Sequence, residues 1–153
     1  MSEHVFDVVF KITGDEVLTK NLEALEKNVR MKILRPAMKK GATIVAREAK
    51  RRVPVRTGFL KKAIKPISTR RDASAMVVMN RKIANPAEMR ISHKGDQPRP
   101  YRPAYIARIV ERGAHLWNGG EVKAQPWLFP ALEAKREAAL DAIARETRRR
   151  FGG

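Results

Sequence analysis

Two segments marked by proline and glycine, far apart in the chain, most constrain its fold. The first runs from Val53 to Ile64 and reads VPVRTGFLKKAI. The second begins as YIARIVERGA at Tyr105 and resumes as QPWLFPALEA at Gln125. Each places a helix breaker, a tight turn and a new helix start within a few residues. Neither segment contains a plausible catalytic set, so together they favour a scaffold that assembles with other copies and partners.

Length and composition set the broad class of the protein. The 153 residues fit a single domain over residues 1–153, since domains commonly hold about 100–200 residues. Lys and Arg number 33 against 16 Asp and Glu, which gives a formal charge of +17. Such a charge favours contact with nucleic acid, anionic lipid or an acidic protein face, and does not choose among them. There is no Cys, no apolar run of membrane-spanning length and no signal-peptide pattern, so we expect a soluble protein made in the cytoplasm.

The N-terminal part of the chain predicts one strand followed by helices. Alternating apolar residues predict a half-buried strand over Val5–Ile12. From about Asp15 the period becomes helical, with an inner row made of Leu18, Leu22, Leu25 and Val29. Pro36 either restarts a helix or kinks a continuing one.

A second amphipathic stretch follows Pro36 and should end at Val53-Pro54, because the residue before a proline avoids the helical region. Its apolar row contains Met38, Ala42, Val45 and Ala49. Its other faces carry six cations, namely Lys39, Lys40, Arg47, Lys50, Arg51 and Arg52.

The middle of the chain predicts a short helix, a hairpin and a loop. Thr57 is placed to cap a helix over Phe59–Ile64. Two β-like runs, Ile64–Thr69 and Ala75–Met79, predict a hairpin. Residues 81–103, rich in proline and charge, predict a long surface loop.

The last third predicts a turn and a terminal helix. Tyr105–Glu111 is apolar enough to be buried and suits either a helical turn or a strand. Asn118-Gly119-Gly120 marks a turn, and Pro130 stands at the head of a helix that runs to about Arg150. The inner row of that helix contains Leu132, Ala139, Leu140, Ile143 and Thr147. The fold class is therefore α+β, with long amphipathic helices packed on a small, mainly antiparallel sheet and a C-terminal helix.

Motifs for catalysis, metals or cofactors are not found, so we expect neither an enzyme nor a cofactor. His4, His93 and His115 stand alone without zinc-ligand spacing, and there is no phosphate-binding loop. Glu111 stands out because it follows an apolar run and precedes Gly113. A general base is one interpretation, but a carboxylate that holds a turn or pairs with a cation is much the commoner role.

The aromatic residues allow two interpretations. Interleaved with Arg, the four residues Tyr101, Tyr105, Trp117 and Trp127 would suit base stacking, although no nucleic-acid-binding motif accompanies them. Trp127 and Phe129 flank a helix start and suit core or interface packing. Trp117, beside Asn118-Gly119, suits an exposed interface anchor.

The two segments resemble the HK97 gp10-like family of tailed-bacteriophage proteins. PVRTGFLKKAI at 54–64 is similar to the family's P-V-x-T-G-x-L-x-x-S-I, and YIARIVERGA at 105–114 to its Y-A-x-x-V-E-x-G-T. PWLFPAL at 126–132 resembles its P-F-L-x-P-A-L. The order also agrees, and the resemblance covers the chain from about Leu18 onward. Tail-completion and virion-morphogenesis proteins of Mu-like and P2-like phages share a similar T-G-x-L pattern.

The resemblance implies a structural protein of the virion neck or upper tail, assembled in the host cytoplasm, that acts in head–tail joining or tail completion. It implies a ring of copies in contact with connector, stopper or tail-tube subunits, around a channel where DNA is met non-specifically, with no membrane partner. A basic nucleic-acid-binding protein is the alternative. The motif positions expected at interfaces are Pro54, Thr57, Gly58, Leu60, Tyr105, Glu111, Gly113, Trp117, Pro126, Trp127 and Pro130.

Overall fold

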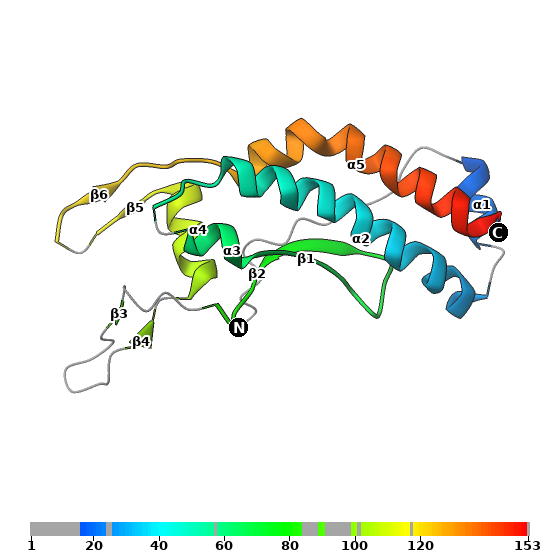
Figure 1. Ribbon diagram of the computed structural model, residues 1–153, viewed down its shortest axis with the longest axis horizontal. Helices are drawn as coiled ribbons and strands as arrows, with labels where there is room; N and C mark the ends of the chain where they lie inside the picture. The colour runs from blue at the N-terminus through cyan, green and yellow to red at the C-terminus, as the bar shows by residue number, and fades with distance from the viewer. Residues whose placement is uncertain are drawn as a thin grey trace.

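The computed structural model describes residues 16–23, 26–56, 58–83, 89–90, 99–100, 102–116 and 118–152. Two long helices, α2 (Lys27–Arg52) and α5 (Leu128–Phe151), dominate it. They lie antiparallel and in contact along their length, and the hairpin of β1 (Ile64–Ser68) and β2 (Ala75–Met79) packs on the other side of α2 (Figure 1). The predicted α+β class is confirmed, and α2 is its central layer. The strand predicted over Val5–Ile12 lies outside the described residues.

Small side chains allow α2 to be covered on both sides. Ala37, Ala42 and Ala49 are fully buried, and Gly41 faces α5. A Cβ on Gly41 would lie only 2.5 Å from Cδ1 of Ile143, so the two helices approach closely at this level. The apolar row predicted for the stretch after Pro36 is confirmed, because Met38, Ala42, Val45 and Ala49 all belong to the core.

The helix runs through Pro36 rather than restarting there, and it ends at Arg52 as the Val53-Pro54 dipeptide predicts. Of the row predicted before Pro36, the side chains of Leu18, Leu22 and Leu25 lie outside the described residues, and the assignment of Val29 is wrong. The N-terminal helix α1 (Glu16–Glu23) stops before α2, and Glu26 between them has an extended backbone with ψ of 140°. This break changes the helical phase, so Val29 is exposed instead of inward-facing.

The predicted hairpin is confirmed, with an antiparallel register from Ile64 opposite Met79 to Ser68 opposite Ala75. Along β2 the buried residues alternate, as a strand with one covered face requires. Ala75, Val77 and Met79 are the buried set and belong to the core that α2 shares.

Two predictions on the second half are changed or decided by the structure. The segment 81–103 is not wholly loop, because β3 (Met89–Arg90) pairs with β4 (Arg99–Pro100). Tyr105–Glu111 resolves as helix, within α4 (Pro103–Arg112), and of that run Ala107 is the buried member while Tyr105 is exposed. A helix that packs along one narrow side explains why an apolar run is not all buried.

The terminal helix begins two residues before Pro130, which becomes its third residue, and its predicted inner row is confirmed for Ala139, Ile143 and Thr147. Leu132 and Leu140 are only partly buried. The predicted turn at Asn118-Gly119-Gly120 joins β5 (Ala114–His115) to β6 (Glu121–Val122), and this β5–β6 ribbon projects from the body (Figure 1).

Two buried glutamates, Glu146 on α5 and Glu48 on α2, form ion pairs with Lys and Arg side chains of the two long helices. Glu146 on α5 accepts hydrogen bonds from Lys40 Nζ at 2.8 Å, Arg149 Nη2 at 2.6 Å and Arg150 Nε at 2.7 Å. These bonds, from Arg149 first and then Lys40, lower the pKa of Glu146 from its ordinary value to about 2. On α2, Glu48 accepts from Arg52 and Arg51, and the Arg52 bond is the main cause that lowers its pKa. The Lys40–Glu146 pair also crosses between the helices and so favours one register of α2 against α5.

Candidate functional site

The structure gathers the family-motif segments at one end of the two long helices. The first segment contains the turn after α2 and the short helix α3 (Phe59–Ala63), and the second contains α4 and the start of α5 (Figure 1). Helix α3 contacts α4, and the backbone N–H of Gln125 donates to the carbonyl of Val110 at 2.7 Å. We call this region the motif end. Of the predicted positions, Thr57 and Trp117 lie outside the described residues.

Glu111 is the centre of the motif end. Its Oε2 accepts the backbone N–H groups of Trp127 at 2.7 Å and Leu128 at 2.9 Å, and its Oε1 accepts that of Phe129 at 3.1 Å. The next residue, Pro130, has no N–H. The carboxylate therefore accepts hydrogen bonds from all the backbone N–H groups at residues 127–130. A negative group at this position also interacts favourably with the positive end of the helix dipole. The interpretation of Glu111 as a carboxylate that holds backbone is therefore confirmed.

Glu111 caps α5 from a distance along the chain, because α5 has no capping side chain of its own. Trp127 occupies the N-cap position of α5, and its side chain makes no capping hydrogen bond. The indole packs in the core with 1% exposure, and its N–H finds no acceptor among the described residues. Core packing, predicted for Trp127, is confirmed, whereas Phe129 points outward.

Gly113 makes the connection between α4 and β5. Its φ is +73°, a conformation that favours glycine, and its N–H donates to the carbonyl of Ile109 at 2.7 Å. A Cβ at this position would lie 2.6 Å from the carbonyl oxygen of Val122 and 3.0 Å from the amide nitrogen of Ala124. The chain that leaves α4 therefore passes directly against the chain that returns to α5.

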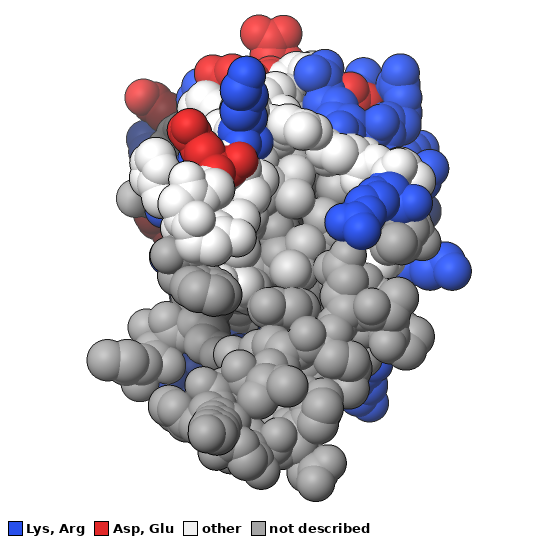
Figure 2. Space-filling model, turned by 90° about the vertical axis from the view of Figure 1, so that its left-hand side faces the viewer, with Lys and Arg blue, Asp and Glu red and all other residues white. Residues whose placement is uncertain are grey.

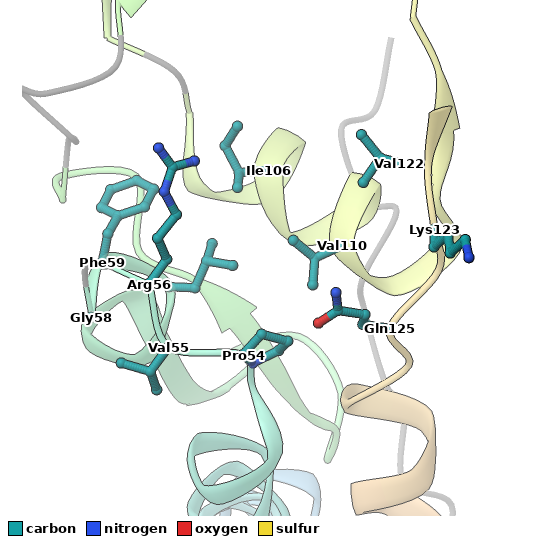
Figure 3. Close-up of a pocket in the computed structure, with 11 residues that line it drawn as sticks. Pro54, Val55, Arg56, Gly58, Phe59, Ile106, Val110, Val122, Lys123 and Gln125 are labelled. Atoms are coloured by element: carbon teal, nitrogen blue, oxygen red, sulfur yellow. The ribbon is translucent and has the colours of Figure 1, made fainter. Parts of the chain in front are cut away.

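A cavity of about 400 Å³ opens between the motif segments (Figure 3). Pro54, Phe59 and Leu60 supply part of its wall, and Ile106 and Val110 of α4 supply another. Arg56, Lys123 and Gln125 are its polar members, so the described residues of the lining include cations and no carboxylate. Such a surface suits an apolar side chain accompanied by a negative group.

Large apolar side chains are also exposed at this end. Val55 after α2 is 63% exposed, Phe129 at the start of α5 is 61% exposed, and Tyr105 in the first turn of α4 is 53% exposed. Exposed apolar groups that gather on neighbouring elements are typical of interaction surfaces. Leu60, by contrast, is buried, so this motif position packs the core.

The described ranges offer little for other chemistry. Within them, no three His, Asp or Glu side chains come together as metal ligands. None of their helices combines the length and apolar character that a bilayer crossing requires.

Comparison with known proteins supports two of the three motifs that carry the resemblance. The model of the HK97-gp10-like family, described as "Bacteriophage HK97-gp10, putative tail-component", matches residues 16–113. No curated protein and no solved structure matches the chain. The matched range holds the elements from α1 to α4 and ends at Gly113, so the motif at 126–132 lies beyond it. The chain therefore belongs to the HK97-gp10-like family of bacteriophage tail components, which are virion proteins.

Proposed function

We propose that the protein acts in head–tail joining or tail completion, as a ring-forming subunit of the phage neck or upper tail. The observation that carries the proposal is the motif end itself. There, distant segments are fixed to one another by Glu111 and Gly113, while Val55, Tyr105 and Phe129 remain exposed. A rigid unit with outward apolar groups suits contact with another protein copy.

The contact expected in a ring is heterologous, because one surface of each copy meets a different surface of the next. The cavity beside Val55 has cations and apolar groups but no carboxylate, so it fits an apolar and acidic surface. The β5–β6 ribbon carries exposed Leu116 and Glu121 and extends away from its own body (Figure 1). Its tip therefore has the chemistry that the cavity of a neighbouring copy would accept.

Native mass spectrometry and negative-stain electron microscopy test the proposal, on the protein alone and with tail-tube, connector or stopper subunits. We expect closed rings for the wild type and smaller species for Val55→Glu and Phe129→Glu. Val29→Glu is the matched control, since Val29 is exposed but lies on the first turn of α2, away from the motif end. Monomers under every partner condition would contradict ring assembly.

A second test uses the phage. Virions made without this protein should contain separate heads and tails, and supplied wild-type protein should restore joined particles while Phe129→Glu should not. Joined, infectious particles in its absence would exclude the role.

A further inference from the structure

One side of α2 carries a row of basic side chains. The helix contains ten Lys or Arg residues and a single acidic residue, Glu48, which is buried. Lys32, Lys39, Arg47 and Lys50 follow one another at spacings of seven, eight and three residues, which places them on one side of a helix. We call these four residues the α2 stripe. It extends over about 27 Å at 1.5 Å per residue.

The cations of the α2 stripe are available for a partner. Lys32, Lys39 and Arg47 are exposed and Lys50 is partly exposed. Among the described residues, no carboxylate pairs with any of the four. By contrast, Lys40, Arg51 and Arg52 on the same helix are held by Glu146 or Glu48. Three cations of α2 are thus paired with carboxylates of the fold, whereas the four cations of the α2 stripe point into solvent.

The acidic residues of the helical layer lie elsewhere. Glu133, Glu137 and Asp141 follow at four-residue spacing on α5 and are all exposed, on the side opposite its buried row. Viewed from the end, most Lys and Arg side chains in sight gather on one upper side, and most carboxylates lie on the other (Figure 2). In this view the cations and the carboxylates are thus largely separated.

We propose that the α2 stripe binds the phosphate backbone of nucleic acid without reading its sequence. Four cations that no described carboxylate pairs with lie along about 27 Å, which matches a run of about eight phosphates spaced about 3.4 Å apart along one strand. Pro36 and Thr43 lie between the cations of the α2 stripe. Val29, in the first turn of α2, is the one exposed large apolar residue of the described helix. Protein interfaces are enriched in aromatic residues and depleted in Lys, so this composition favours phosphates over a protein partner.

This inference rests on the proposed function in one point only, which is that the protein would meet DNA in the channel of a ring. The binding itself requires no ring and can be measured separately. The motif end and the α2 stripe contain different residues, so variants can separate assembly from nucleic-acid binding.

The test is a fluorescence-anisotropy titration of a labelled DNA duplex of unrelated sequence, repeated from about 50 to about 200 mM salt. Wild-type affinity should fall steeply as salt rises. In Lys39→Ala/Arg47→Ala the slope of log affinity against log salt should shrink by about 2, because each lost phosphate contact removes roughly one unit. Affinity at the low-salt end should drop about tenfold or more.

Arg70→Ala/Arg71→Ala is the matched control, because it removes the same charge from exposed residues of the β1–β2 turn. It should bind nearly as the wild type does. Equal weakening by both double variants would overturn the proposal, since net charge alone would then explain binding. Unchanged DNA binding with loss of rings in Lys39→Ala/Arg47→Ala would also overturn it and would make the stripe a subunit interface. Loss of rings in Phe129→Glu with intact DNA binding would leave it standing.

Discussion

The motif end and the α2 stripe are two surfaces of the same molecule that are built in opposite ways. At the motif end, the Glu111 carboxylate and Gly113 hold the end of α4 at defined distances from the returning chain and the start of α5. On the stripe, side chains point into solvent without partners among the described residues, and the helix alone sets their spacing. The first surface depends on shape, and the second depends on charge density. Substitutions should therefore affect stability at one and salt-dependent binding at the other.

The largest effect on stability is expected from Gly113→Ala. The substituent would meet the carbonyl oxygen of Val122 and the nitrogen of Ala124, in addition to the strain of a positive φ. We expect the free energy of unfolding, measured by chemical denaturation, to fall by about 2–4 kcal/mol.

Gly119→Ala is its control, because Gly119 also has positive φ, at +81°, but open space around it. This variant should lose only about 1–2 kcal/mol. Equal losses in the two variants would show that the close approach at Gly113 contributes nothing.

The next largest effect is expected from Glu111→Ala, which leaves three backbone N–H groups at the start of α5 without their acceptor. The expected loss is about 1–3 kcal/mol, and Glu111→Gln should lose less because one acceptor oxygen remains. Denaturation midpoints of these variants can be compared with Glu121→Ala, which changes an exposed carboxylate of the ribbon. A Glu111→Ala protein as stable as the Glu121→Ala protein would refute the capping role.

A smaller effect should appear in acid. The folded protein holds the pKa of Glu146 at about 2, below its unfolded value, so the ionised form stabilises the fold. This contribution is complete above the ordinary pKa of about 4.5 and is lost as the pH falls towards about 2.

Thermal unfolding followed between pH 6 and about 2 should therefore show a decline that Glu146→Gln reduces. Asp141→Asn, on the exposed acidic row of the same helix, provides the comparison. If both variants show the wild-type pH profile, the cluster around Glu146 does not contribute.

The smallest effect on stability is expected from Lys39→Glu/Arg47→Glu on the α2 stripe. Exposed charges rarely alter folding by more than about 0.5 kcal/mol, and removal of like-charge repulsion offsets part of any loss. A stability loss comparable with that of Glu111→Ala would end the distinction between the two surfaces.

Local chemistry explains what could be predicted from the sequence. Val53-Pro54 ends α2, and the alternation over Ala75–Met79 identifies a strand, because both signals act over a few residues. The break before α2 has no glycine or proline to mark it, and the inward assignment of Val29 failed for that reason.

The role of Glu111 depends on contacts across 16 to 18 residues, which no local pattern specifies. One signal was present, since the start of α5 has Trp127 where a Ser, Thr, Asp or Asn cap is usual. A buried helix start without a local cap can take its acceptor from elsewhere in the chain. The cations of the α2 stripe were visible in the sequence, but their separation from the cations held by Glu48 and Glu146 required the structure.

The bonds at Glu111 also make the intervening segment replaceable. The chain leaves the body at Gly113 and returns at Gln125, whose N–H is held by Val110, and Glu111 fastens the residues that follow. Both ends of the ribbon are thus anchored to one helical turn, and the length between them is not set by the core. An epitope or a fluorescent label inserted between Asn118 and Gly119 would extend the ribbon without changing its attachment. The same arrangement would let the ribbon differ in length among related chains while the body stays intact.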